Sequence, residues 1–258
     1  MNNIVFQVNI IGHRTKPEFE CSTKSWSNWC EKNNFLHLTL TEPIYDLNFM
    51  NANWHKFFCL ELLENENIEY DQVCIVDADT IVHPDCPNFF EETDNKFSVV
   101  QTEGCYEWVN RSIDSYHNHI FTDVELDVWR YFNSGFMVIN KNHKKFCDDI
   151  YKFYNENRDK LVYAQEKFKV GTDQTPINFL TKRHNIELKF LPNCYNLQDL
   201  FKKDLLFIDG YSWWKDSLDN MYNSGWVYHF NAVPQNTSGR DAGYWLKRTY
   251  EELYENRK

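Results

Sequence analysis

The sequence predicts an α/β protein: a single domain with a Rossmann-like, mostly parallel sheet flanked by helices. Strand-like and helix-like segments alternate through the first half, which is the pattern of βαβ units. The segment QVCIVDADTIV at 72–82 is apolar on both faces except for its two aspartates, as in an interior strand of a parallel sheet. A length of 258 residues is enough for one large domain that buries its own core.

In the first half, hydrophobic patterns define each expected element. We expect strands at 4–11, 36–40, 72–82 and 97–101. A helix is expected over about 22–33, because the Ser22 hydroxyl can cap its first turn. A second helix is expected over about 50–63, where Trp54, Phe58 and Leu62 share one stripe.

In the second half, shorter strands alternate with longer helices. We expect strands at 135–140, 187–190 and 226–231, and helices at about 143–157, 172–182 and from 241 onward. The helix at 143–157 carries Phe146, Ile150, Phe153 and Tyr154 on one face, and Thr172 can cap the next helix. The polar stretch at 103–127 shows no clear period, which favours a lid or substrate loop.

The charge balance excludes some classes of partner. Asp plus Glu is 38 against 27 for Lys plus Arg, a formal net charge of -11. Nucleic acids and anionic membranes require clustered cations, so neither is expected as a main partner. A phosphate-bearing substrate would need positive charge brought to the site.

The eight cysteines lack a C-x-x-C pair, which favours free thiols in a reducing compartment over disulfides. The N-terminal segment has no basic region before its short apolar run, and no run of about 18 apolar residues could span a bilayer. We therefore expect a soluble, cytoplasmic protein without a membrane span.

Asp77 and Asp79 close the strand at 72–82. Residues i and i+2 of an extended segment lie on one side, so both carboxylates are expected to converge where the strand ends. Two such charges beside an apolar strand are costly unless a cation lies between them, and hard oxygens suit Mg²⁺ or Mn²⁺. Asp-x-Asp alone is weak evidence, because it occurs by chance in many acidic chains.

Four segments together resemble a known family, in the order in which that family carries them. They are YDQVCIVDADTIV at 70–82, FNSGFMVIN at 132–140, GTDQTPINFL at 171–180 with LPNCYN at 191–196, and WVYHFNA at 226–232. The chain resembles glycosyltransferases of the GT-A fold that use nucleotide-sugar donors, most closely the family 8 group of glycogenin and bacterial lipopolysaccharide galactosyltransferases. The resemblance implies one GT-A domain over 1–258, with a nucleotide-binding half at 1–101 and an acceptor and donor-sugar half at 102–258.

The resemblance also implies a metal site. Asp77, Asp79 and His229 would hold a divalent ion, Mn²⁺ or Mg²⁺, that bridges the two donor phosphates. Asp77 and Ala78 would also lie close to the nucleotide. The alternative for His229 is a core histidine satisfied by a backbone hydrogen bond.

Two further segments are implied to face the sugar. Asn133, Ser134 and Gly135 resemble the lining of the donor-sugar pocket, where a glycine lets the backbone approach a ligand; the alternative is a plain turn. Asp173 and Gln174 resemble the family's catalytic pair at a helix start; the alternative is the ordinary preference for acidic residues there.

The remaining candidates concern the nucleotide. Asn9 and Arg14, after the first strand, and Lys56 resemble donor contacts, although Lys56 could equally lie on a solvated helix face. The family often has a carboxylate where this chain has Thr175, and a Lys-Pro-Trp where it reads AVPQNTSGR. Arg240 and Lys247 are candidate substitutes for the missing lysine, and no spacing selects between them.

These observations predict a metal-dependent hexosyltransferase that moves a sugar from a nucleotide-diphosphate sugar, a UDP-sugar, to a hydroxyl acceptor. The family 8 resemblance implies retention of configuration; a likeness at the level of the fold alone leaves inversion open, with Asp173 as base. One alternative is a HAD-type phosphohydrolase with Asp77 as nucleophile and Asp148 and Asp149 as its late acidic pair. Another is a non-catalytic carbohydrate-binding protein. Trp213 and Trp214 could stack on an acceptor, although core packing is favoured.

Overall fold

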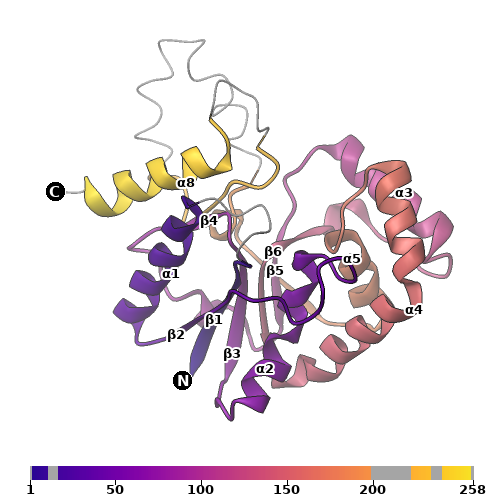
Figure 1. Ribbon diagram of the computed structural model, residues 1–258, viewed down its shortest axis with the longest axis horizontal. Helices are drawn as coiled ribbons and strands as arrows, with labels where there is room; N and C mark the ends of the chain where they lie inside the picture. Colours follow the sequence, from indigo (N-terminus) through magenta and orange to yellow (C-terminus); the bar gives the residue numbers. More distant parts are fainter. Residues whose placement is uncertain (1, 11–16, 199–221, 234–239, 257–258) are drawn as a thin grey trace.

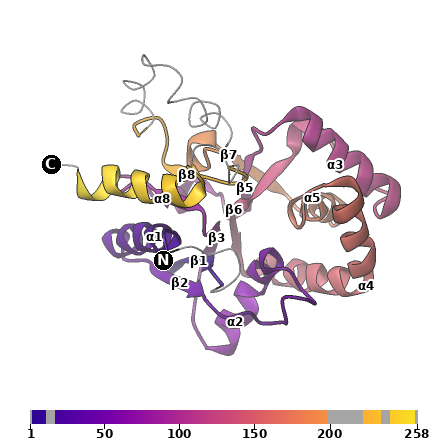
Figure 2. The same ribbon diagram turned by 45° about the horizontal axis from the view of Figure 1, so that its top comes forward.

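A computed structural model describes residues 2–10, 17–198, 222–233 and 240–256. Its strands form a six-stranded sheet, in the order β2-β1-β3-β6-β5-β7, and a two-stranded ribbon of β4 and β8 (Figures 1 and 2). The strands are β1 (Asn3–Val8), β2 (Leu36–Leu40), β3 (Gln72–Asp77), β4 (Thr80–Val82), β5 (Phe97–Gln101), β6 (Phe132–Asn140), β7 (Leu188–Leu191) and β8 (Val227–His229).

The main sheet is mostly parallel, as predicted. β1 runs parallel to β2 and β3, and β5 runs parallel to β7. β6 is the exception, because it runs antiparallel to both β3 and β5. Its first residues therefore lie beside the carboxyl end of β3, with Phe136 opposite Val76.

Helices cover both faces of the sheet, as predicted, with α1 and α8 to one side and α2 to α5 to the other (Figures 1 and 2). The α-helices are α1 (Phe19–Asn33), α2 (Cys59–Asn65), α3 (Tyr106–His119), α4 (Lys144–Phe168), α5 (Gln174–Arg183) and α8 (Ala242–Tyr250). Shorter helical turns are η1 (Ala52–Phe58), η2 (Phe89–Glu92), η3 (Val128–Arg130), η4 (Lys141–His143), η5 (Asn193–Tyr195) and the π-helical η7 (Glu251–Glu255).

The alternation of side chains along each strand divides the core between these layers. Ile4 and Phe6 of β1 pack with α2 and α4, whereas Val5 packs with Trp26 and Trp29 of α1. A third cluster lies under α8, where Trp245 and Leu246 cover the ribbon. The ribbon thus packs between α1 and α8.

The predicted strand at 72–82 is wrong as a single element. β3 ends at Asp77, Ala78 and Asp79 form a turn, and β4 leaves the main sheet to pair with β8. Thr80 fixes the turn, because its hydroxyl donates to the Asp77 carbonyl at 2.7 Å and accepts from the Trp26 indole at 2.9 Å. Both faces of β4 are apolar because the ribbon is buried between two clusters.

Two helix starts differ from the prediction. α1 begins at Phe19, so Ser22 lies inside the helix, where it accepts from the Gln7 amide at 2.8 Å instead of capping. The helix expected at 50–63 is a 3₁₀-helix followed by the short α2, and Asn51 caps it.

The expectation of a lid or substrate loop at 103–127 is wrong as to its conformation, because the helix α3 occupies its centre. Val109, Ile113 and Tyr116 form a buried stripe at helical spacing, which the many polar neighbours obscure in the sequence. Tyr116 donates its hydroxyl hydrogen to the Gly171 carbonyl at 2.7 Å. This segment therefore packs as a fixed part of the domain next to α5.

The later elements follow the predictions more closely. The aromatic stripe of α4 is buried as predicted, and the helix runs on to Phe168. α5 starts at Gln174 after Asp173, and the Thr172 hydroxyl donates to the Asp173 side chain instead of capping. Asp241 caps α8 by accepting from the Tyr244 amide at 3.1 Å. Trp213 and Trp214 lie outside the described residues.

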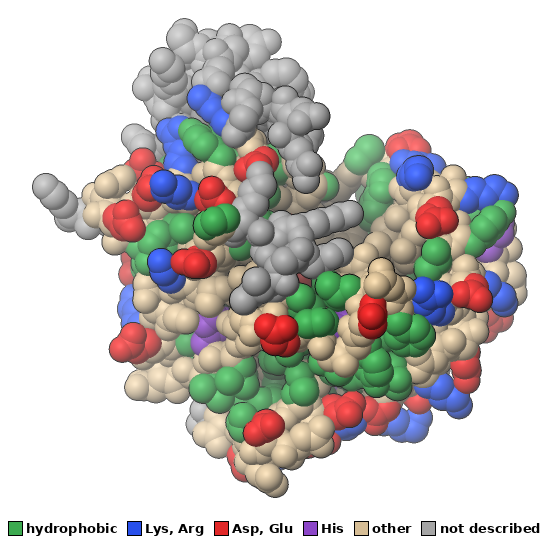
Figure 3. Space-filling view, viewed as in Figure 1, with side chains coloured by type: hydrophobic (Ala, Val, Ile, Leu, Met, Phe, Trp, Pro, Cys, Tyr) green, Lys and Arg blue, Asp and Glu red, His purple; other side chains and the backbone are tan. Residues whose placement is uncertain are grey.

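All eight cysteines are free, as predicted. Among the helices that the structure describes, none combines the length and the apolar character needed to cross a bilayer. Acidic and basic side chains are interspersed over the face shown in Figure 3.

Candidate metal and donor site

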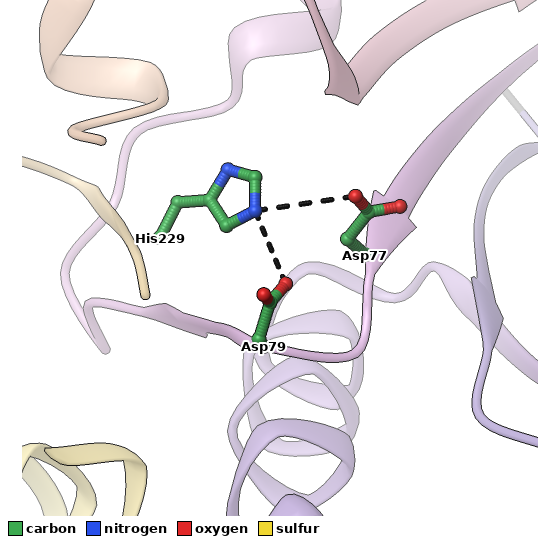
Figure 4. Close-up of side chains that lie close together, drawn as sticks. All are labelled: Asp77, Asp79 and His229. Carbon is green, nitrogen blue, oxygen red and sulfur yellow. Dashed lines mark ion pairs between the residues drawn. The ribbon is translucent and has the colours of Figure 1, made fainter. Parts of the chain in front are cut away.

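Asp77, Asp79 and His229 meet at the carboxyl edge of the sheet (Figure 4). The ribbon register pairs Thr80 with His229, which brings the imidazole to the turn between β3 and β4. His229 Nε2 lies 3.1 Å from Asp79 Oδ1 and 3.9 Å from Asp77 Oδ2. The predicted convergence is present, but the turn produces it, because Asp79 is no longer part of the strand.

His229 is oriented toward the two carboxylates. Its side chain is 1% exposed, and Nδ1 lies 3.0 Å from the Asn196 side-chain oxygen. Nε2 is buried and makes no hydrogen bond. An orphaned ring nitrogen beside two carboxylates fits a divalent cation, and one nitrogen with carboxylate oxygens is a ligand set that Mn²⁺ accepts. The alternative of a histidine satisfied by a backbone bond does not fit this geometry.

Lys56 of η1 is buried beside Asp77. Its ammonium nitrogen lies 2.8 Å from Asp77 Oδ1, 3.1 Å from Asp173 Oδ2 and 3.0 Å from the Ser134 carbonyl oxygen. An ammonium has three protons, and these three acceptors take them all. Lys56 therefore does not lie on a solvated helix face, and that alternative is wrong. Its expected contact with the nucleotide-sugar donor stays a prediction, and the donor would have to replace one of these three acceptors.

The charges in this cluster shift one another's pKa values. Burial acts to lower the pKa of Lys56, but Asp173 and Asp77 outweigh it and raise it. Burial raises the pKa of Asp77 against the opposing effect of Lys56. For Asp79 burial also acts upward, but the neighbouring His229 outweighs it and lowers the pKa. Asp79 is therefore the carboxylate of the pair that keeps its charge more readily.

The candidate donor-sugar residues lie within β6 and not in a plain turn. Ser134 Oγ donates to Asp173 Oδ2 at 2.8 Å, and Asn133 Nδ2 donates to Gln174 Oε1 at 2.9 Å. The two segments that the sequence placed near the sugar, 133–135 and 173–174, are thus joined to each other.

Gly135 leaves no room for a side chain. A β-carbon there would lie 2.4 Å from His229 Cε1, 2.8 Å from Asp77 Oδ2 and 2.9 Å from Asn133 Oδ1. The sequence predicted that Gly135 lets a ligand approach the backbone closely. In the structure, the groups that approach it closely are the side chains of His229, Asp77 and Asn133.

Two residues near the site have partners that the sequence did not reveal. Thr175, where the family often has a carboxylate, shares a hydrogen bond of 2.6 Å with the buried Tyr131 hydroxyl. Asn196, the last residue of LPNCYN, is fully buried against His229 and Asn133. In the sequence, only its place in the segment LPNCYN suggested that Asn196 is near the site, and that segment did not indicate a role for it.

Asn9 directly follows β1, whose last residue Val8 pairs with Asp77, so it lies at the same edge of the sheet as the candidate ligands. Its backbone N–H donates to the Leu40 carbonyl at 2.9 Å. Arg14 lies outside the described residues. Lys247 of α8 forms an ion pair with Glu251 at the start of η7, and the Arg240 guanidinium lies over the Tyr244 ring.

The geometry does not support the phosphohydrolase alternative. Asp148 and Asp149 lie on α4, where they form ion pairs with Lys144 and Lys145 one turn earlier. Such i,i+4 pairs are typical of a solvated helix surface. No contact links this acidic pair to Asp77 or Asp79 within the described ranges.

No protein-family model matches the chain, and no curated protein matches its sequence. Solved structures do resemble its fold. A glycosyltransferase involved in the glycosylation of the major capsid of PBCV-1 aligns with a TM-score of 0.59 at 9% identity, over 98% of this chain and 100% of that one. Mouse xyloside xylosyltransferase 1 aligns with a TM-score of 0.50 at 13% identity, over 91% of this chain and 99% of that one. The fold is accordingly that of GT-A glycosyltransferases.

Proposed function

We propose that this protein is a metal-dependent glycosyltransferase of the family 8 type. It would transfer a hexose from a UDP-sugar, or another nucleotide-diphosphate sugar, to a hydroxyl of a carbohydrate or similar acceptor. The observation that carries the proposal is the convergence of Asp77, Asp79 and His229 at the carboxyl edge of a GT-A sheet. Ligands of open α/β sheets bind at this edge.

The three ligands would hold Mn²⁺ or Mg²⁺ there. When bound, such an ion supplies Lewis-acid stabilisation of the charge on the leaving diphosphate. The chain would hold the rest of the donor with Asn133, Ser134 and Gly135 at the sugar, and with Asn9, Arg14, Lys56 and Ala78 at the nucleotide. Residues 1–101 would then form the nucleotide half of a single domain, and 102–258 the acceptor half.

Asp173 is better placed to stabilise positive charge than to remove a proton. Its Oδ1 accepts from Thr172 at 3.0 Å, and its Oδ2 accepts from Ser134 at 2.8 Å and lies 3.1 Å from Lys56. These donors occupy the carboxylate and hold it rigidly. We therefore assign Asp173 and Gln174 to electrostatic support of an oxocarbenium-like centre, which favours retention over inversion. In that reaction the anomeric carbon exchanges its diphosphate oxygen for the acceptor oxygen, and the hydroxyl proton leaves with the diphosphate.

A panel of nucleotide sugars tests the proposal. With Mn²⁺ present, the protein should slowly release nucleoside diphosphate from at least one donor. Turnover of p-nitrophenyl phosphate without any such release would favour the phosphohydrolase, and sugar binding without either reaction would favour a non-catalytic protein.

A matched pair of variants tests the site itself. In a thermal shift assay, Asp79→Ala should abolish the Mn²⁺-dependent stabilisation by UDP, because the variant loses a ligand. Asp148→Ala removes an exposed carboxylate on α4 and should keep the full shift. If UDP with Mn²⁺ stabilises Asp79→Ala as it does the wild type, Asp79 is not a metal ligand.

A further inference from the structure

We propose that Asn196 is a positioning residue that holds the Nδ1–H of His229, so that Nε2 is the ring nitrogen offered to a cation at Asp77 and Asp79. The inference rests on the proposed metal-dependent function and adds a residue beyond the three ligands. Asn196 follows η5 and is 0% exposed, and its amide lies between Asn133 and His229.

The argument starts from the backbone of β6. The Gly135 N–H donates to the Asn133 side chain at 2.8 Å. A backbone N–H can only donate, so the atom that it meets must be the amide oxygen, Oδ1. The Asn133 amino group then faces Gln174 Oε1 at 2.9 Å, and the Ser134 N–H donates to that same oxygen at 3.3 Å. Two backbone groups thus fix the orientation of both amides.

The orientation of Asn196 follows from that of Asn133. Asn133 Oδ1 lies 3.0 Å from Asn196, which must present its amino group because an oxygen there would find no donor. The Asn196 oxygen is then the atom 3.0 Å from His229 Nδ1. Since an amide oxygen only accepts, Nδ1 must carry a proton.

A proton on Nδ1 decides what Nε2 can do. In a neutral imidazole with Nδ1 protonated, the lone pair is on Nε2. That nitrogen faces the carboxylates of Asp77 and Asp79, 3.9 Å from Asp77 Oδ2 and 3.1 Å from Asp79 Oδ1, and without a cation a proton can lie between it and Asp79. A cation would replace only that proton, and the Nδ1–H bond to Asn196 would stay in place. Partners of this kind are worth about 10- to 100-fold in metal affinity.

Two substitutions separate this role from simple packing. Asn196→Ala removes the acceptor for Nδ1. Asn196→Asp keeps an acceptor at that place but loses the donor to Asn133. Gln198→Ala is the matched control, because it removes a buried amide two residues away that bonds the Gln101 carbonyl at 3.2 Å. A purely structural role predicts that the aspartate variant is at least as damaging as the alanine variant.

The first measurement needs neither metal nor donor. Long-range ¹H–¹⁵N correlation spectra of histidine-labelled protein report which ring nitrogens are protonated, and His229→Gln assigns the signal. We expect a protonated Nδ1 of His229 whose hydrogen exchanges slowly with water in the wild type, in Asn196→Asp and in Gln198→Ala, and loss of this slowly exchanging signal in Asn196→Ala, where the acceptor is gone. An unprotonated Nδ1 in the wild type, or an unchanged spectrum in Asn196→Ala, would overturn the proposal.

The second measurement is the Mn²⁺ dissociation constant by titration calorimetry. Asn196→Ala should raise it about 10- to 100-fold, whereas Asn196→Asp should stay within about threefold of the wild type and Gln198→Ala should not change it. Equal affinity of wild type and Asn196→Ala would overturn the positioning role and leave the proposed function standing. A wild type that binds no Mn²⁺ would instead contradict the proposed function, and the spectra would still decide the role of Asn196.

Discussion

Gly135 and His229 share a volume at the edge of the sheet that holds only one side chain. Gly135 lies inside β6, next to Phe136, which pairs with Val76 of β3, and its own N–H is bonded to the Asn133 side chain at 2.8 Å. His229 is held at the end of β8 by its backbone bond to Leu197, at 2.7 Å. Because neither backbone can give way easily, the absence of a side chain at 135 is what admits the imidazole.

Gly135→Ala should therefore weaken Mn²⁺ binding at least about tenfold, because the new methyl group would overlap His229 Cε1 and displace the ring. Titration calorimetry measures the effect, and circular dichroism checks that the variant is folded. The control is Gly243→Ala on α8, where the nearest atoms are side-chain oxygens of Asp241 and Glu18 at 3.3 Å. Unchanged Mn²⁺ affinity in Gly135→Ala would show that the imidazole is not confined as the structure indicates.

The Asn178 side chain joins the middle of α5 to the first residue of β6. Asn178 accepts from the Phe132 N–H and donates to the Phe132 carbonyl, both at 2.9 Å, as a neighbouring strand would. The β5–β6 pairing is irregular here, with a register shift between Val99 and Val100. The Asn178 amide thus makes the hydrogen bonds that a neighbouring strand would make with Phe132, the first residue of β6. These bonds also hold α5, whose start carries Asp173 and Gln174, against the sheet.

Removing this amide should be costly. We expect Asn178→Ala to lower the free energy of unfolding by about 2–4 kcal/mol, because two buried backbone groups lose their partner. Urea unfolding measures the change. Asn110→Ala is the control, since that exposed amide bonds only a carbonyl of its own helix and should change stability by less than about 0.5 kcal/mol. Equal losses in the two variants would show that Asn178 does not join α5 to β6.

Some of the helices and strands could be predicted from the sequence, and others could not. Strands at 36–40 and 97–101 and the buried stripe of α4 follow from local hydrophobic patterns, and the structure has them as predicted. The division of 72–82 into two strands could not be predicted in this way. It depends on β8, whose partner β4 lies about 150 residues earlier in the chain.

The site follows the same rule. The three candidate metal ligands were suggested by Asp-x-Asp and by the flank of His229, because those signals are local. The burial of Lys56 and the contact of Asn196 with His229 were not, because each depends on partners far away in sequence. Lys56 meets residues from β3, β6 and the start of α5, which only the folded sheet brings together.

The protein has a formal net charge of -11, and its candidate site is negatively charged as well. Asp77, Asp79 and Asp173 contribute three negative charges, and Lys56 contributes one positive charge, which leaves a net charge of -2 among these four groups. A nucleoside diphosphate would add more negative charge. The negative charge of the site thus opposes binding of a nucleoside diphosphate only as long as no divalent ion is bound between Asp77, Asp79 and His229.

Chelation should therefore change UDP binding far more than uridine binding. We expect Mn²⁺ to tighten UDP binding at least about 100-fold over binding in EDTA, which is about 2.7 kcal/mol. Uridine has no phosphates and should bind equally in both conditions. In EDTA, raising the salt concentration from about 20 mM to about 200 mM should not weaken UDP further, because salt screens a repulsion there. Calorimetry that finds UDP equally tight in EDTA would mean that basic residues of the chain neutralise the diphosphate without a metal.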